Sequence, residues 1–149
     1  MNKEANINRL EHTLFYELEK AIKSYRQYAQ RNIKTNQIDI TIDQWLLLKA
    51  IKDNPELSQK EIAGLVFKDY ASITRMIELM VQKKYLIRSF HEVDRRRFKI
   101  ELTAKSEKLY GDLVPIILSN RGVALKGLSE KELSLLSGLL QRITNNCTE

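Results

Sequence analysis

The sequence predicts a mainly α-helical protein with a small antiparallel β-wing, and three observations support this fold class. Glycine and proline are scarce, at five and two of 149 residues, while 43% of the residues are hydrophobic and 30% are charged. This composition favours a folded, helix-rich domain over a disordered chain or a strand-rich fold with many turns. Apolar residues recur at spacings of three and four through most of the chain, which is the helical period. Two short stretches, residues 86–90 and 98–102, have instead the character of strands.

The N-terminal segment has the pattern of one long amphipathic helix that begins near residue 5 and ends near Ile33. Its apolar positions are Ile7, Leu10, Leu14, Leu18, Ala21, Ile22, Tyr25, Tyr28 and Ala29. A helix of about 28 residues exceeds the usual length in a compact domain. It therefore either lies across a large core or packs against another subunit.

Capping motifs divide the next part of the chain into three expected helices. A T-x-x-Q pattern at Thr41 opens the first, which must end before Pro55. An S-x-x-E capping box at Ser58 opens a short second helix, and Asp69 can cap the third. Residues 58–83 therefore have the length and order of a helix-turn-helix.

A hairpin is expected directly after this motif. Residues 86–90 and 98–102 are its strands, and the tip between them holds three consecutive arginines, Arg95, Arg96 and Arg97. Two strands with a basic tip after a helix-turn-helix form a wing. The sequence thus predicts a winged helix-turn-helix.

The C-terminal third returns to a helical pattern. Thr103 can cap a long helix, in which Pro115 should produce a kink or a local change in hydrogen bonding. A second S-x-x-E capping box at Ser129 opens the last helix.

We therefore expect a single domain, residues 1–149, with two lobes. We expect residues 41–102 to form the winged helix-turn-helix lobe, and the arginines of the wing tip indicate that this is the DNA-binding lobe. Residues 5–35 and 103–146 are the flanking helices, and we expect them to form a helical dimerisation lobe.

The positive charge is concentrated in one part of the chain. The formal net charge is +6, and residues 60–99 hold ten basic and five acidic side chains. Residues 1–59 hold nine basic and eight acidic side chains, and residues 100–149 hold six of each. A local basic field indicates a polyanionic partner such as nucleic acid. The chain has no apolar run of about 18 residues and no N-terminal signal core, so we expect a cytoplasmic protein without a membrane partner.

The sequence gives no support for catalysis or metal binding. It contains no glycine-rich phosphate loop, no nucleophile–base pair and no Cys/His cluster with metal-ligand spacing. We expect a non-enzymatic protein with no catalytic residue, no metal site and no cofactor. The single cysteine, Cys147, has only Arg142 as a nearby cation, which argues against a redox sensor.

Three motifs resemble the MarR family of bacterial transcriptional regulators. Residues 94–96 (D-R-R) are similar to the D-x-R motif of the wing in this family, and residues 102–103 (L-T) to the end of its second wing strand. Residues 72–75 (S-I-T-R) are similar to the S-x-[VI]-T-R stretch of its recognition helix. Two positions depart from the family pattern, because Lys84 and Ser106 stand where glycine is common.

This resemblance covers nearly the whole chain and implies a function. Members of the family are typically homodimers with intertwined terminal helices that bind pseudo-palindromic double-stranded DNA. Many release DNA when a small, often phenolic, ligand binds. The resemblance thus implies a homodimeric, sequence-specific transcriptional regulator, and repression more than activation. The alternative is a winged-helix module that binds protein rather than specific DNA, which the wing arginines disfavour.

The residues expected to bind DNA lie on the recognition helix and the wing. They are Lys68, Tyr70, Ser72, Thr74, Arg75, Arg95, Arg96, Arg97 and Lys99. Arg75 can donate two hydrogen bonds to a guanine, and arginines at the wing tip suit the narrow minor groove. Asp94 is expected to hold Arg96 in orientation by a charge-assisted hydrogen bond.

Four aromatic residues fall where the first two helices are expected to meet. They are Tyr16, Tyr25, Tyr28 and Trp45. Aromatic residues at helical spacing either belong to the core or line a cavity, here for a small aromatic or phenolic effector. The sequence leaves both interpretations open.

Overall fold

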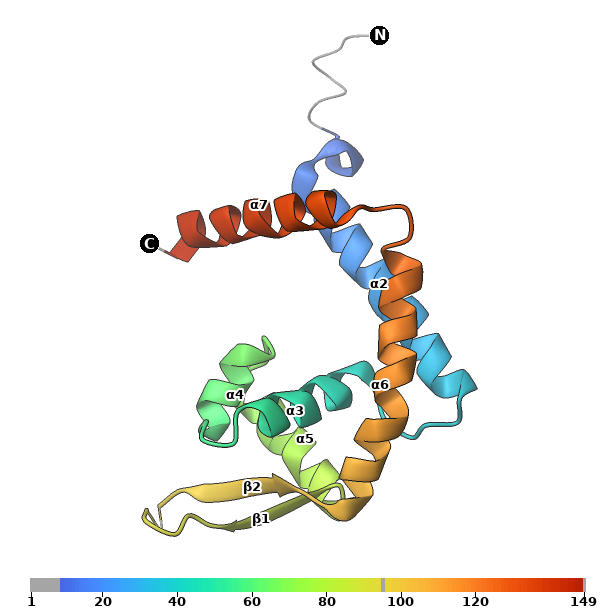
Figure 1. Cartoon of the computed structure of the whole chain (residues 1–149). Coiled ribbons are helices and arrows are strands. Elements are labelled where there is room, and N and C mark those ends of the chain that lie inside the picture. The colour runs from blue at the N-terminus through green and yellow to red at the C-terminus, as the bar shows by residue number, and fades with distance from the viewer. Residues whose placement is uncertain (1–8, 95, 149) are drawn as a thin grey trace, which may run out of the picture.

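A computed structural model describes residues 9–94 and 96–148, and its mainly helical architecture with a two-stranded wing confirms the predicted fold class. The elements are η1 (Leu10–His12), α2 (Leu14–Thr35), α3 (Ile42–Asp53), α4 (Gln59–Leu65), α5 (Tyr70–Gln82), β1 (Leu86–Phe90), β2 (Phe98–Leu102), α6 (Ala104–Ala124) and α7 (Glu130–Thr148). In Figure 1, α3, α4, α5 and the hairpin form one lobe, α2 and α6 rise from it side by side, and α7 projects back over it.

The first long helix begins later than the sequence pattern predicted. A short 3₁₀ turn comes first, and α2 begins at Leu14 because Thr13 has an extended backbone and acts as its N-cap. The Thr13 hydroxyl accepts a hydrogen bond from the Tyr16 N–H at 3.3 Å. The predicted start near residue 5 lies outside the described residues.

The other predicted helix starts are confirmed by their capping groups. Thr41 Oγ1 accepts the Gln44 N–H at 3.1 Å, and Gln44 Oε1 accepts the Thr41 N–H at 3.0 Å. Ser58 Oγ accepts the Glu61 N–H at 3.2 Å. Such side chains satisfy amide groups that the first turn of a helix leaves without partners.

The hydrophobic core lies between α2, α3, α5, α6 and the base of the hairpin. Its fully buried side chains include Ile33, Leu47, Leu48, Ile73, Ile77, Met80, Leu86 and Leu113. The strands pair antiparallel from Leu86 opposite Leu102 to Phe90 opposite Phe98. The paired base is therefore anchored in the core, while the far end of the hairpin extends away from it (Figure 1).

The two departures from the family pattern have different structural consequences. Ser106 is fully buried in the first turn of α6, where its hydroxyl accepts the Thr103 N–H at 2.9 Å, so the side chain completes a capping box. Lys84 has a φ of 64°, the left-handed conformation that favours glycine. It ends α5 in a Schellman motif, in which the Tyr85 N–H bonds to the Met80 carbonyl at 2.9 Å.

Helix α6 continues through Pro115. The proline has no N–H to donate to the carbonyl of the preceding turn, so the expected local change in hydrogen bonding occurs without ending the helix. Among the described helices, none combines the length and the apolar character needed to cross a membrane.

Replacement of Lys84 by glycine should stabilise the protein. A left-handed backbone costs a residue with a Cβ about 1–2 kcal/mol, and the greater entropy of glycine in the unfolded chain offsets part of the gain. We expect Lys84→Gly to raise the free energy of unfolding by about 0.5–1 kcal/mol in urea denaturation. Lys83→Gly is the matched control. Lys83 has a φ of −76°, so glycine there should destabilise the fold, and equal effects of the two changes would contradict this account.

Candidate nucleic-acid interface

The start of α5 is fixed by its capping residue. Asp69 Oδ1 accepts the Ser72 N–H at 2.8 Å, and Asp69 Oδ2 accepts the Ser72 hydroxyl at 2.8 Å. The hydrogen bond from the Ser72 N–H holds the pKa of Asp69 below its ordinary value, and the hydroxyl adds to this effect. The cap therefore stays charged and complements the positive end of the helix.

One face of α5 is buried and the opposite face is available to a partner. Ile73, Ile77 and Met80 have no exposed surface. Tyr70 is 57% exposed, and Arg75 lies on the exposed side with its Nη2 3.4 Å from Ser72 Oγ. The helix thus presents Tyr70 and Arg75 at its N-terminal half, where recognition helices contact base edges.

Thr74, like Ser72, uses its hydroxyl for hydrogen bonds within the lobe. It donates to the Tyr70 carbonyl at 2.9 Å and accepts from Gln59 Nε2 at 2.7 Å. Gln59 is the first residue of α4. Thr74 therefore connects the two helices of the helix-turn-helix.

Lys68 is likewise paired within the chain. Its Nζ lies 3.2 Å from Asp43 Oδ2 at the start of α3. Asp43 also accepts a hydrogen bond from Arg26 of α2. The Lys68 ammonium is thus balanced by a carboxylate in the DNA-free chain.

The hairpin carries an aromatic pair beyond the core. The rings of Phe90 and Phe98 stack across the two strands with centroids 5.6 Å apart, and the Arg88 guanidinium lies 5.3 Å from the Phe98 centroid. Cross-strand contacts of this kind stabilise a hairpin. They stiffen the part of the wing that the core does not reach.

The wing tip is organised through backbone groups, and Asp94 provides two of their acceptors. Its carboxylate accepts the Arg96 backbone N–H at 3.0 Å, and its carbonyl accepts the Arg97 N–H at 3.0 Å. The bond to Arg96 therefore forms at the amide and not at the guanidinium, because the short aspartate side chain folds onto its own turn. His91 Nδ1 adds to this turn by accepting the N–H groups of Val93 and Asp94 at 3.2 and 3.1 Å.

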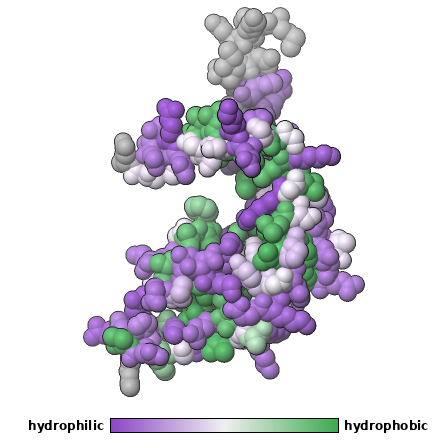
Figure 2. Space-filling view, in the orientation of Figure 1, coloured by the Kyte–Doolittle hydropathy of each residue, from purple (hydrophilic) through white to green (hydrophobic). Residues whose placement is uncertain are grey.

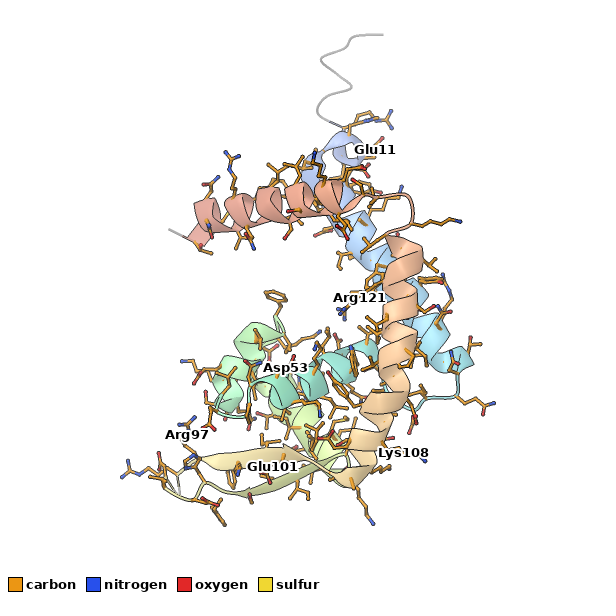
Figure 3. All side chains as sticks on the ribbon, viewed as in Figure 1. Glu11, Asp53, Arg97, Glu101, Lys108 and Arg121 are labelled. Atoms are coloured by element: carbon orange, nitrogen blue, oxygen red, sulfur yellow. The ribbon has the colours of Figure 1, made fainter. Side chains whose placement is uncertain are left out.

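The tip arginines extend from this ordered turn. Arg96 and Arg97 are exposed, and within the described residues neither guanidinium has a hydrogen-bonding partner. Figure 3 shows Arg97 at the outer end of the hairpin and Glu101 further along β2. Arg95 lies outside the described residues. Lys99 is paired with Glu101 at 3.0 Å, and this hydrogen bond raises the pKa of Lys99.

The four aromatic residues near α2 do not share one cavity. Trp45 is buried, and its ring lies 4.7 Å from that of Tyr110 on α6. Tyr25 alone of the four lines the groove of about 780 Å³ between α2, α6 and α7. Tyr16 and Tyr28 are half-buried elsewhere on α2.

Three residues important to this geometry were missed in the sequence. His91 and Gln59 accept or donate hydrogen bonds that hold the tip and the helix pair, and Asp43 holds Lys68. Asp43 has only the weak signal of an acidic residue in the first turn of a helix. No local pattern shows which distant side chain each of them meets.

Comparison with known proteins agrees with this arrangement. Residues 38–97, which contain the helix-turn-helix and the wing tip, match the MarR family. The match covers α3, α4, α5, β1 and the wing tip, and does not include the terminal helices. Members of that family are DNA-binding transcriptional regulators of the winged helix-turn-helix type and are not enzymes. The described residues contain no cluster of three or more potential metal ligands.

Solved structures show the same fold over nearly the whole chain. A transcriptional regulator named SlyA is 25% identical, with 90% of this chain and 93% of that chain covered and a TM-score of 0.79. BpsR of Bordetella bronchiseptica, whose DNA binding is regulated by 6-hydroxynicotinic acid, is 22% identical over 91% and 96% of the two chains, with a TM-score of 0.81. MepR of S. aureus, in complex with DNA, is 21% identical over 94% and 100%, with a TM-score of 0.82.

The geometry of the tip predicts different effects for two substitutions of Asp94. Asp94→Ala removes the acceptor for the Arg96 N–H, and we expect operator affinity to fall about three- to tenfold, the equivalent of one hydrogen bond. Asp94→Asn keeps a carbonyl acceptor and should bind within about twofold of the parent. Fluorescence anisotropy with labelled duplex at about 0.15 M salt measures both. Equal loss in the two variants would show that the charge, and not the turn, is what matters.

Proposed function

We propose that this regulator is a homodimeric, ligand-responsive repressor that binds a pseudo-palindromic operator in the cytoplasm. The observation that carries the proposal is the exposure of Arg75 together with Arg96 and Arg97 on one lobe. A helix and a wing joined through one core can reach a major groove and the adjacent minor groove together. A dimer repeats this pair with two-fold symmetry, so an inverted repeat is the matching DNA sequence.

Support for the dimer comes from apolar surface that the single chain leaves uncovered. No described residue of α7 is buried. The exposed large apolar residues of the terminal helices include Leu10, Leu14, Phe15, Ile22, Leu118, Val123, Leu125, Leu128, Leu135, Leu136, Leu139 and Leu140. Figure 2 shows apolar surface gathered where α7 meets α2 and α6. Patches of this kind mark interfaces, and a second copy of the same helices would cover them.

The expected small aromatic or phenolic effector has its best candidate site in the same region. Tyr25, Leu18 and Ile22 of α2 line the groove of about 780 Å³, and Arg121 of α6 reaches it. An apolar lining with one cation, Arg121, and one carboxylate, Glu19, suits an aromatic ring that carries polar groups. A ligand held between the terminal helices would change their arrangement and with it the separation of the two recognition helices, and so release the operator.

Disruption of the apolar surface should separate the subunits. Leu14 and Leu136 are 60% and 46% exposed in the single chain, so Leu14→Asp combined with Leu136→Asp should damage the interface more than the core of one chain. We expect the double variant to lose operator binding and to sediment as a monomer or unfold. Leu65→Asp, at a similarly exposed position on α4, should remain dimeric. A parent chain that sediments as a monomer at micromolar concentration would contradict the proposal.

Arg75 and Arg97 should affect DNA binding differently. Arg75→Ala should cost about 1–3 kcal/mol per lost base contact and relax preference at one position in each half-site selected from random DNA. Arg97→Ala should weaken operator and random duplex by similar factors and lower the magnitude of the log–log salt slope by about 1.8 for a dimer. Selection that returns only asymmetric single sites would exclude the two-fold operator. If Arg75→Ala and Arg97→Ala reduced the preference for the operator over random duplex equally, Arg75 would not be a base-reading residue distinct from the phosphate contact Arg97.

A further inference from the structure

Asp43 stands where three parts of the fold meet. Its carboxylate accepts a hydrogen bond from the Arg26 guanidinium of α2, and the Lys68 ammonium of the α4–α5 turn lies 3.2 Å away. Partial burial opposes ionisation of Asp43, but the hydrogen bonds from Arg26 and Lys68 outweigh it and hold its pKa below the ordinary value. We call these three residues, Arg26, Asp43 and Lys68, the Asp43 junction.

The junction is reinforced on the side of α2. Gln30, one turn after Arg26, accepts the backbone N–H of Ile42 through its Oε1 at 2.9 Å. Ile42 is the first residue of α3 and Asp43 the second. Two side chains of α2 therefore hold the first turn of α3, one through the backbone and one through the carboxylate.

On the other side, the junction reaches the start of the recognition helix. Lys68 directly precedes Asp69, the N-cap of α5. Its backbone N–H bonds to the Ala63 carbonyl at 2.9 Å, which closes the end of α4. The Lys68 backbone is thus part of the helix-turn-helix. Its side chain contacts Asp43 of α3, which in turn is bound by Arg26 of α2.

We propose that Asp43 is a positioning residue that fixes the recognition helix relative to α2, and so sets the separation of the two recognition helices in the dimer. This inference rests on the proposed function, because α2 is an element of the dimerisation lobe. Half-sites about 10 bp apart require both helices at the right separation at once. Random duplex, which is bound mainly through phosphates, has no such requirement.

An electrostatic role and a positioning role for Asp43 predict opposite changes in operator affinity when its charge is removed. Two cations and one carboxylate give the junction a net charge of +1, which would become +2 and leave Lys68 available to phosphate. Electrostatics alone therefore predicts tighter binding to every duplex. Positioning predicts tighter binding to random duplex but weaker binding to the operator, because the start of α5 is no longer held.

The test compares Asp43→Asn with Asp39→Asn. Asp39 is 86% exposed and lies 3.5 Å from Lys83 at the end of α5, so its change also removes one charge and releases one lysine. We expect Asp39→Asn to preserve the ratio of operator to random affinity. Asp43→Asn should lower that ratio at least about threefold, within the range of coupled polar pairs. The parent protein should bind an operator poorly when one base pair is added or removed between its half-sites. For Asp43→Asn, this loss of affinity should be smaller. Asp43→Glu, which can restore the ion pairs, should recover part of the ratio.

Lys68→Gln tests the junction from the other partner and keeps the Arg26–Asp43 pair. If Lys68 is held for positioning, the variant should lose operator preference while the salt slope stays within error of the parent. If Lys68 is a phosphate contact, the slope should fall by about 1.8 and both affinities should drop together. Thermal unfolding and sedimentation show whether each variant is folded and dimeric. Should Asp43→Asn fail to fold, Lys68→Gln decides the question.

The outcomes separate this inference from the proposed function. A parent protein that prefers no selected sequence over random duplex would overturn the proposed function and the inference with it. A parent that discriminates, together with an Asp43→Asn variant that keeps the same ratio and the same spacing preference, would overturn the inference alone. A phosphate-like salt slope for Lys68→Gln would overturn it as well.

Discussion

The structure depends on the burial of one face of α5. Ile73, Ile77 and Met80 have no exposed surface, and complete burial of such side chains contributes roughly 1.5–3 kcal/mol each. This burial fixes the rotation of the helix about its axis. The other face, with Tyr70 and Arg75, is directed outward as a consequence. A DNA-reading surface is therefore the part of α5 that the core leaves uncovered.

Polar side chains near this helix divide into those that build the lobe and those that remain available. Thr74 and Lys68 are engaged by Gln59 and Asp43. Arg75 stays on the surface with only a long contact to Ser72. The same division occurs in the wing, where Asp94 is used by its own turn and the guanidinium of Arg97 is not. Side chains that stabilise the lobe and side chains that can bind DNA are thus neighbours in sequence. The former make hydrogen bonds or ion pairs within the chain, and the latter point to its surface.

The terminal helices differ from the DNA-binding lobe in how much of their apolar surface the single chain buries. The DNA-binding lobe has a hydrophobic core formed within one chain. In contrast, α7 buries none of its described residues and leaves Leu136 and Leu140 exposed. An amphipathic helix with an uncovered apolar face is stable when another surface covers it. The proposed dimer supplies that surface. In such an assembly the fold of the lobe is local to one chain, and the separation of the two lobes is a property of both.

Features that depend on residues three or four positions apart could be predicted from the sequence alone. The capping patterns at Thr41 and Ser58, the capping residue Thr103 and the helical spacing of apolar residues predicted the helices, because caps and amphipathic faces are local interactions. Contacts between side chains of different helices and strands became visible only in the folded chain. The fold placed Trp45 against Tyr110 and Lys68 beside Asp43. These pairings follow from how the core packs α3 against α2 and α6, and the side chain directions that result have no periodic signature in the chain.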